Sequence, residues 1–167
     1  MKPDIYLLLD NVRSSLNVGS LLRTAEGLGI KEVYLCGYTP YPLMPNDHRL
    51  PHLAAKVNRR IKKTALGAES SQVWSYYPNA LVIVNQLKAQ NTCILALEQA
   101  ANSISLTSFK PDRPVCLIVG NEAAGVNSEL LSAADTIAEI PMLGTKESFN
   151  VAVAGGMALF YLVNMLK

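Results

Sequence analysis

The sequence predicts an α/β fold in which a mostly parallel β-sheet carries helices on both faces. Short apolar runs, typical of buried strands, alternate along the chain with longer segments whose apolar residues recur every three or four positions. Half of the 167 residues are hydrophobic and 17% are charged, so the chain can bury a core and is not disordered. We therefore expect a single domain over residues 1–167, without internal repeats.

A β-α-β unit is predicted over the first 36 residues. Ile5 to Leu9 is an apolar run suited to a buried strand. The polar residues Ser14 to Asn17 offer caps for a helix over about Val18 to Leu28, and Gly29 supplies its C-terminal stop. Glu32 to Cys36 is the next strand.

The middle of the chain contains a loop and two predicted helices. Residues 37–52 hold four prolines and form a long loop, and long loops on small domains are often functional. A helical pattern runs from Leu53 to Lys63. Residues 64–71 are small and polar, and the segment after them receives no predicted element. Asn79 then caps a helix that runs to about Ala89.

Three further strands and two helices complete the pattern. The strands are expected at Thr92 to Leu97, at Val115 to Val119 and at Thr136 to Ile140. A helix is expected near Ser128 to Ala134, and the last helix begins near Ser148. Strands and helices that alternate in this way form a parallel sheet.

The cysteines and histidines do not indicate a metal site. The cysteines are odd in number and lie in or beside apolar runs, which is typical of buried, reduced thiols in a cytosolic protein. Both histidines, His48 and His52, lie in one loop without cysteine partners, whereas zinc needs three or four converging ligands. The net charge of +2 neither requires nor excludes a polyanionic partner, because local clustering matters more.

The two ends of the chain bear on location. The N-terminal segment meets Asp4 and Asp10 without a long apolar stretch, so a signal peptide is not expected and the predicted location is cytoplasmic. Residues 149–166 carry no charge and approach the length of a membrane span. Asn150 and Asn164 favour the alternative, a helix buried in the core or in a subunit interface, and no membrane partner is expected.

Three polar clusters follow predicted strands. They lie at 17–23, at 120–122 and at 148–150. In open parallel sheets, ligands bind at the carboxyl ends of the strands, so these clusters are candidate site residues. Each also has a plain structural explanation, since Asn17 and Ser148 can cap helices and Gly120 can form a turn.

The spacing of the clusters carries a resemblance to a known family. The stretch NVGSLLRTA from Asn17, the stretch LIVGNEAAGV from Leu117, and IPM from Ile140 followed by SFNVAVA from Ser148 resemble the three motifs of SpoU/TrmH-type RNA 2'-O-ribose methyltransferases. They occur in the family's order, ALEQ from Ala96 matches a further segment, and the resemblance spans about residues 5–166. Phe149 stands where many members have leucine, which affects pocket shape more than chemistry.

The resemblance implies a SPOUT-type fold with a C-terminal trefoil knot, although chains are in general not knotted. It further implies that S-adenosylmethionine binds in the knot and that the protein forms a homodimer through the knot region. A Rossmann glycine fingerprint is missing after the first strand, as expected for a cofactor bound in this other way. The positions that map onto cofactor contacts are Leu97, Gly120, Ile140, Met142, Leu143, Ser148 and Asn150.

The implied activity is methyl transfer to a ribose 2'-hydroxyl of RNA. The implied catalytic residues are Arg23, Asn17, Glu122, Ser148 and Asn150. A guanidinium is effectively always protonated, so we expect Arg23 to grip the neighbouring phosphate and lower the pKa of the hydroxyl rather than act as the base. Glu122 is expected to orient Arg23 through an ion pair, while Asn17, Ser148 and Asn150 hold the ribose and the loop.

Five basic side chains in the second predicted helix indicate where RNA binds, unless they form only a solvated helix surface. With Arg23, the predicted RNA-binding residues are Lys56, Arg59, Arg60, Lys62 and Lys63. Many ribosomal members carry an additional RNA-binding domain before the catalytic one, whereas this sequence starts its first strand at Ile5. Transfer RNA is therefore expected ahead of ribosomal RNA.

Two other functions fit parts of the pattern. A SpoU-like domain can hold RNA or cofactor without catalysis, although the full set of polar site residues argues against a degenerate copy. An unrelated nucleotide- or flavin-binding α/β protein can use the turn at Asn17 to Ser20 for phosphate. The sequence lacks a phosphate-loop signature, and this alternative function leaves the third cluster unexplained.

Overall fold

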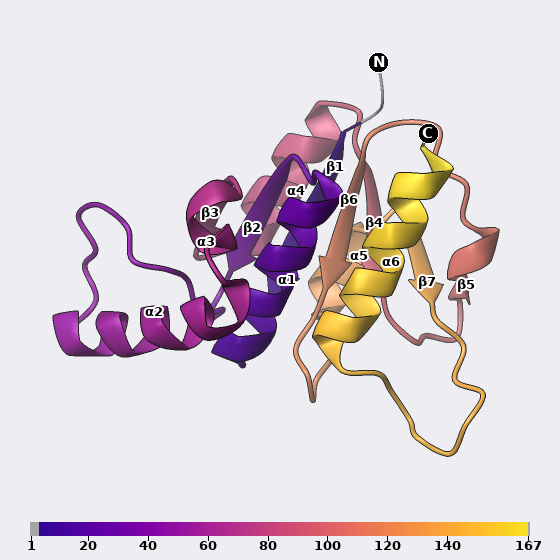
Figure 1. Cartoon of the computed structure of the whole chain (residues 1–167). Coiled ribbons are helices and arrows are strands. Elements are labelled where there is room, and N and C mark those ends of the chain that lie inside the picture. Colours follow the sequence, from indigo (N-terminus) through magenta and orange to yellow (C-terminus); the bar gives the residue numbers. More distant parts are fainter. Residues whose placement is uncertain (1–3, 167) are drawn as a thin grey trace.

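A seven-stranded, wholly parallel sheet forms the centre of the computed structural model, which describes residues 4–166. The strand order is β3-β2-β1-β6-β4-β7-β5 (Figure 1). The strands are β1 (Ile5–Asp10), β2 (Glu32–Cys36), β3 (Trp74–Tyr77), β4 (Cys93–Leu97), β5 (Ile104–Ser105), β6 (Val115–Val119) and β7 (Thr136–Glu139).

Helices cover both faces of this sheet. They are α1 (Ser15–Leu28), α2 (Pro51–Ala65), α3 (Ala68–Ser71), α4 (Ala80–Ala89), α5 (Ser128–Ala133) and α6 (Val151–Met165), with a 3-10 turn at Leu106–Ser108. Buried side chains of α1, α2, α3 and α6 join one core cluster, and those of α4 and α5 join the other. In Figure 1, α1 and α6 lie in front of the sheet, with α4 and α5 behind it. The predicted fold class is confirmed.

The central strands are buried on both sides, which explains their continuous apolar sequences. In β1, Leu7 and Leu9 belong to the cluster under α1 and α6, whereas Tyr6 and Leu8 belong to the cluster under α4. All six residues of β1 and all five of β6 are buried. Sheets of this kind replace the polar-apolar alternation of half-exposed strands by uninterrupted apolar runs.

Side-chain caps set the ends of the helices. The Ser14 side chain accepts a hydrogen bond from the Asn17 amide at 3.3 Å, so α1 begins at Ser15, three residues before its predicted start. Asn150 caps α6, which begins three residues later than predicted. Gly29 ends α1 with φ 67°, the left-handed conformation that glycine adopts without strain.

The elements that the sequence did not predict are α3, β3, β5 and the 3-10 turn. The four residues of β3 are half-buried, and β3 pairs only with β2. At the other edge, β5 contains two residues and pairs only with β7. Short edge strands lack the apolar run that identifies a buried strand, so only their pairing defines them.

The chain doubles back twice within the sheet. β6 inserts between β1 and β4, and β7 inserts between β4 and β5. Because all strands are parallel, the loops that follow β1, β4, β6 and β7 lie together at the carboxyl ends of the strands, which we call the carboxyl edge of the sheet. This edge carries the candidate site. The trefoil knot implied by the resemblance stays a prediction.

The charge-free C-terminal run forms α6, which packs closely on α1. A Cβ atom added at Gly155 would lie 2.7 Å from Leu21 Cδ2, so the two helix backbones approach where glycine stands. Among the described residues, no helix combines the length and the apolar character that crossing a membrane requires. The three cysteines are buried and unpaired, as predicted, and burial raises the pKa of the Cys36 thiol to about 12.

Candidate functional site

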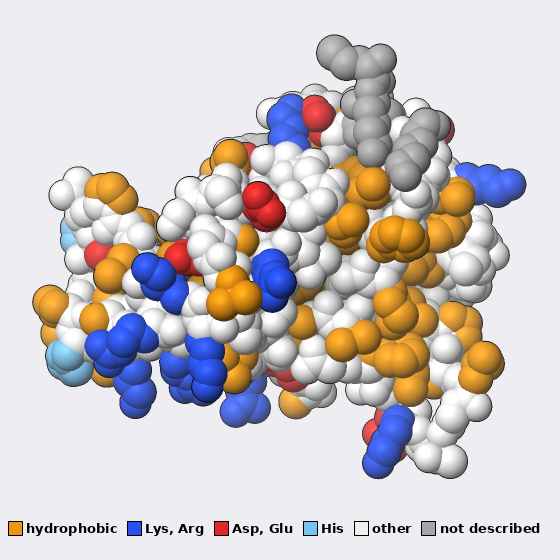
Figure 2. Space-filling view, viewed as in Figure 1, with side chains coloured by type: hydrophobic (Ala, Val, Ile, Leu, Met, Phe, Trp, Pro, Cys, Tyr) orange, Lys and Arg blue, Asp and Glu red, His pale blue; other side chains and the backbone are white. Residues whose placement is uncertain are grey.

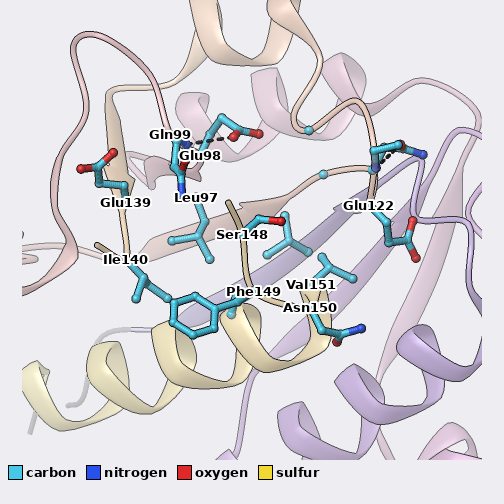
Figure 3. A pocket seen from close by; sticks show the side chains of 16 residues that line it. Leu97, Glu98, Gln99, Glu122, Glu139, Ile140, Ser148, Phe149, Asn150 and Val151 are labelled. Carbon is cyan, nitrogen blue, oxygen red and sulfur yellow. Dashed lines mark hydrogen bonds between the residues drawn. The ribbon is translucent and has the colours of Figure 1, made fainter. Parts of the chain in front are cut away.

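A cleft of about 390 Å³ lies at the carboxyl edge of the sheet, between the loops that follow β4, β6 and β7 and the start of α6. In Figure 3, Leu97 and Gln99 lie on one side of the cleft and the segment from Ser148 to Val151 on the other. Its walls are formed by residues 97–99, residues 119–123, Gly125, Glu139, Ile140, residues 148–151 and Ala154. The cleft therefore combines segments from all of the last three predicted strands.

The loop after β6 is held tightly by its own hydrogen bonds. Asn121 and Gly125 exchange two backbone hydrogen bonds of 2.9 Å, and the Asn121 side-chain oxygen accepts from the amides of Ala123 and Ala124 at 2.8 Å. A Cβ atom at Gly120 would lie well inside 3.0 Å of the backbone of Gly125 and Val126. Only glycine fits there, so this wall of the cleft is fixed before any ligand binds.

Glu98 connects the loop after β4 to the loop after β6. Its Oε2 atom accepts a hydrogen bond of 2.9 Å from the Val126 amide, and Oε1 accepts one of 2.8 Å from the Gln99 amide. Gly125 lies beside this carboxylate with φ 71°, and a Cβ atom added at Gly125 would collide with Glu98 Oε2. Glu98 lies in the ALEQ stretch of the family resemblance but is not among the predicted site residues, although its position directly after a buried strand could have identified it.

A hydrogen-bonded group joins the three polar clusters of the sequence. The Asn17 side-chain amide donates to Glu122 Oε1 at 2.9 Å. The Asn150 amide donates to Asn17 Oδ1 at 3.2 Å, so residues 133 positions apart meet. Glu122, Ser148 and Asn150 also line the cleft. These contacts bring together four of the five predicted catalytic residues.

Several hydrogen-bond donors stabilise the ionised form of the Glu122 carboxylate. Burial alone would raise the pKa, but hydrogen bonds from Arg13, Asn17 and Ser14 outweigh it and lower the pKa below its usual value. The Arg13 amide donates to Oε2 at 2.8 Å and the Ser14 amide to Oε1 at 3.0 Å. The carboxylate thus satisfies backbone donors in the turn that leads into α1.

The predicted ion pair between Glu122 and Arg23 is wrong. Arg23 is exposed, does not line the cleft, and forms no ion pair with another described residue. The physical reason is that the backbone donors of Arg13 and Ser14 occupy the carboxylate, while Arg23 lies six residues beyond Asn17, about 9 Å further along the helix. Arg23 is therefore presented to solvent on α1.

The loop between β7 and α6 forms the second wall and is held by fewer contacts. The Gln99 side chain donates to the Glu147 carbonyl at 3.0 Å. Met142 and Leu143, two of the seven predicted cofactor positions, lie in this loop and do not line the cleft. The other five do line it: Leu97, Gly120, Ile140, Ser148 and Asn150. The Leu143 side chain is 98% exposed.

The predicted basic helix is α2, which projects from the body of the molecule (Figure 1). Its five lysine and arginine side chains are exposed, and Figure 2 shows blue side chains gathered along this projection. Lys62 Nζ lies 3.8 Å from the carboxylate of the buried Glu69, and the other four basic side chains of α2 form no ion pair with a described residue. The local positive charge is therefore largely uncompensated in the part of the chain that the structure describes.

Comparisons with known proteins agree with this geometry. The sequence profile of the SpoU rRNA Methylase family matches residues 4–160. The chain is 28% identical to the tRNA (guanosine(18)-2'-O)-methyltransferase of Escherichia coli (strain K12), over 95% of this chain and 62% of that enzyme. It is 31% identical to the 23S rRNA (guanosine-2'-O-)-methyltransferase RlmB of Xylella fastidiosa, over 93% of this chain and 57% of that protein.

Solved structures share the fold. The AdoMet-bound rRNA methyltransferase from Sinorhizobium meliloti superposes with a TM-score of 0.82 at 26% identity, covering 100% of this chain and 58% of that one. The A. aeolicus TrmH/SpoU tRNA modifying enzyme gives 0.81 at 23% identity, covering 98% and 76%. The chain spans roughly three fifths of the length of the Escherichia coli and Xylella fastidiosa relatives.

Proposed function

Since this chain belongs to the SpoU rRNA methylase family, we propose that it is an S-adenosylmethionine-dependent methyltransferase that modifies a ribose 2'-hydroxyl of RNA. The observation that carries the proposal is the hydrogen-bonded group of Asn17, Glu122 and Asn150 at the mouth of a ligand-sized cleft. Three segments that are distant in sequence meet there, as one active site requires.

The residues of the cleft fit S-adenosylmethionine. Its volume of about 390 Å³ lies within the range of ~300–1,000 Å³ that is typical of small-molecule sites. Apolar side chains such as Leu97 and Ile140 suit an adenine ring, and the carboxylates of Glu98, Glu122 and Glu139 suit a ligand that carries a sulfonium and an ammonium group. The close packing at Gly120 lets backbone groups approach the ligand directly.

Methyl transfer from this cofactor requires the protein to position the ribose more than to activate the methyl group. S-adenosylmethionine, when bound, supplies a methyl group that is already activated on a sulfonium. The chain's own residues must then hold the ribose in line with that methyl group and exclude water. We assign the positioning to Asn17 and Asn150, whose amides lie 3.2 Å apart, and to Ser148, which lines the cleft.

Arg23 is proposed to bind the phosphate next to the target ribose. Its guanidinium is exposed on α1, the helix that begins beside the cleft, and planar guanidinium groups bind phosphate through paired hydrogen bonds. Its positive charge lowers the pKa of the nearby hydroxyl, and a phosphate oxygen or water accepts the proton. Since Glu122 does not hold Arg23, the bound RNA itself must order this side chain.

The exposed basic residues of α2 are proposed to bind the RNA backbone. Replacing Lys62 and Lys63 with alanine should reduce the slope of log affinity against log salt by about 1 to 2, because each phosphate contact contributes ~0.7–0.9. Lys110→Ala, which removes an exposed charge outside α2, is the matched control and should leave the slope unchanged. A slope that is unaltered in the double variant removes α2 from the RNA site.

A homodimer through the C-terminal region is also part of the proposal. Val153, Met157 and Phe160 recur at helical spacing along α6 and are 52%, 38% and 63% exposed. Hydrophobic side chains gather over this helix in Figure 2. Contiguous exposed apolar surface of this kind commonly marks a protein interface. Phe160→Glu should convert a dimer to monomers, as measured by sedimentation.

Two measurements test the proposed function. Calorimetry with S-adenosylmethionine should detect binding to the purified chain. Methyl transfer from labelled cofactor to total RNA, followed by digestion to nucleosides, should yield a 2'-O-methyl nucleoside. Arg23→Lys keeps the charge but loses the paired donors, so transfer should fall by at least about tenfold while cofactor binding is retained.

The outcomes separate the alternatives. Cofactor or RNA binding without transfer supports a non-catalytic SpoU-like binding protein. An absence of cofactor binding rejects the proposal. Mapping the labelled nucleotide decides between transfer RNA, which we expect, and ribosomal RNA, since relatives are named for both.

A further inference from the structure

Tyr38 is an exposed aromatic residue that is hydrogen-bonded to Asn121 of the cleft wall and has no role in the proposed function. It follows Gly37 after the end of β2, and 63% of its surface is exposed. The other tyrosines are buried or half-buried, and those at 76 and 161 direct their hydroxyl groups to backbone carbonyls. The ring of Tyr38 is thus left in water for no reason that the packing of the domain provides.

Hydrogen bonds hold this exposed ring at both ends. The Tyr38 amide donates to Asn11 Oδ1 at 3.1 Å, and the Tyr38 hydroxyl oxygen accepts from Asn121 Nδ2 at 2.9 Å. Asn121 is itself fixed, because its oxygen accepts from two backbone amides and its nitrogen also donates to the Asn11 carbonyl at 2.9 Å. An aromatic ring that is exposed and yet immobilised loses little conformational entropy when a ligand covers it.

The chemistry at the hydroxyl leaves one donor for a ligand. Because Asn121 Nδ2 donates, the Tyr38 oxygen is the acceptor in that hydrogen bond, and no described residue accepts the proton of the hydroxyl. The residue therefore presents an apolar face together with a hydrogen-bond donor. A nucleobase offers the matching groups, an aromatic face and ring or carbonyl acceptors.

The position of Tyr38 favours a nucleobase as the group that covers its ring. Asn121 lines the cleft at whose mouth Asn17 and Asn150 are proposed to hold the ribose, and Tyr38 is one hydrogen bond away from Asn121. A base is attached to the sugar carbon next to the 2' carbon, so the base of the modified nucleotide emerges beside the cleft. The loop that begins at Tyr38 leads directly into the basic helix α2. Unpaired RNA bases are commonly bound by stacking on aromatic side chains.

We propose that Tyr38 is a stacking platform for the base of the RNA nucleotide whose ribose is held at the mouth of the cleft, a role that rests on the proposed function. The platform is sequence-tolerant, since every base has an aromatic face. It acts on RNA binding and not on cofactor binding. It requires the target base to be unstacked from its neighbours, so the platform selects single-stranded segments.

The test compares variants of Tyr38 in the whole chain. The probe is a short single-stranded oligoribonucleotide that carries 2-aminopurine, whose fluorescence is quenched by stacking. Tyr38→Leu removes the aromatic face and should weaken binding roughly 5- to 100-fold and abolish the quenching. Tyr38→Phe and Tyr38→Trp keep a face and should retain the quenching. Leu43→Ala, at a 49% exposed position in the same loop, is the matched control and should behave as the unaltered chain.

The readouts distinguish failure of this inference from failure of the proposed function. Calorimetry with S-adenosylmethionine and thermal unfolding check that each variant is folded. If the unaltered chain methylates total RNA but Tyr38→Leu has the same KM for RNA and the same quenching, the stacking role is wrong. A Tyr38→Leu variant that changes only the oligomeric state assigns the ring to a subunit contact and also overturns it. Absence of cofactor binding and of methyl transfer in the unaltered chain instead rejects the proposed function.

Discussion

The loops after β6 and β7 form opposite walls of one cleft but are stabilised very differently. Residues 120–126 are fixed by paired backbone hydrogen bonds, by the side chain of Asn121 and by Glu98 from the loop after β4. Residues 141–149 are mostly exposed, and the Gln99 side chain donates the hydrogen bond that links them to the loop after β4. One wall is ordered by the chain itself, and we expect ligand binding to order the other.

Because the two walls are stabilised differently, we expect sequence changes in one wall to affect folding and changes in the other to affect ligand binding. Substitutions in the wall after β6 should reduce stability, because its contacts form within the folded chain. Substitutions in the wall after β7 should leave stability intact and alter cofactor affinity.

Alanine substitutions at two glycines, one in each wall, should show the largest difference in stability between the walls. In Gly120→Ala the new Cβ atom collides with the backbone of Gly125 and Val126, so the free energy of unfolding should fall by about 1 to 3 kcal/mol and cofactor binding should be lost. In Gly144→Ala the Cβ atom meets nothing within 4 Å, and stability should change by less than about 0.5 kcal/mol. Urea unfolding measures both, and equal effects would show that the walls do not differ.

Substitution of Glu98, whose carboxylate joins the loops after β4 and β6, should have the second largest effect on the free energy of unfolding. Glu98→Ala leaves the Val126 amide without its acceptor and should cost about 1 to 3 kcal/mol in the free energy of unfolding. Gln99→Ala removes an exposed bond to the β7 loop and should cost less than about 0.5 kcal/mol. Glu98→Gln retains an oxygen acceptor and should fall between them. A larger loss for Gln99→Ala would reverse our assignment of the rigid wall.

The pH dependence of stability should identify the contribution of Glu122. Its pKa is lower in the folded chain than its ordinary value of 4.5, so its contribution is present above that value and is lost as the pH falls through the lower, folded value. Glu122→Gln should therefore be less stable than the unaltered chain at pH 7, by no more than about 1 kcal/mol after solvent screening. The difference should vanish in acid below the folded pKa. Urea unfolding across this range measures it, and a constant difference would contradict the prediction.

The smallest effect on stability is expected at Leu143. Its side chain is 98% exposed, so Leu143→Ser should change the free energy of unfolding by less than about 0.5 kcal/mol. If ligand binding folds this loop over the cleft, affinity for S-adenosylmethionine should nevertheless drop roughly 3- to 10-fold, because part of a leucine side chain is then buried by the ligand. An unchanged affinity in calorimetry would remove Leu143 from the cofactor contacts.

Elements that depend on residues close together in the chain could be predicted from the sequence alone. The uninterrupted apolar runs of β1 and β6 predicted buried parallel strands, and Gly29 and Asn79 marked helix ends correctly. The order and spacing of three polar clusters indicated one site, because strand ends in a parallel sheet share an edge. These features depend on residues that are neighbours in sequence, so periodicity and capping reveal them.

The partners of the site residues and the edge strands of the sheet could not be predicted from the sequence, because they depend on how the whole chain packs. Glu122 is bound by donors more than 100 positions away and not by Arg23, and Asn17 meets Asn150 across 133 positions. β3 and β5 exist through pairing with strands that precede or follow them at a distance. The physical reason is that a hydrogen bond needs two groups at about 3 Å, and such proximity arises from packing of the whole chain rather than from local residue pattern.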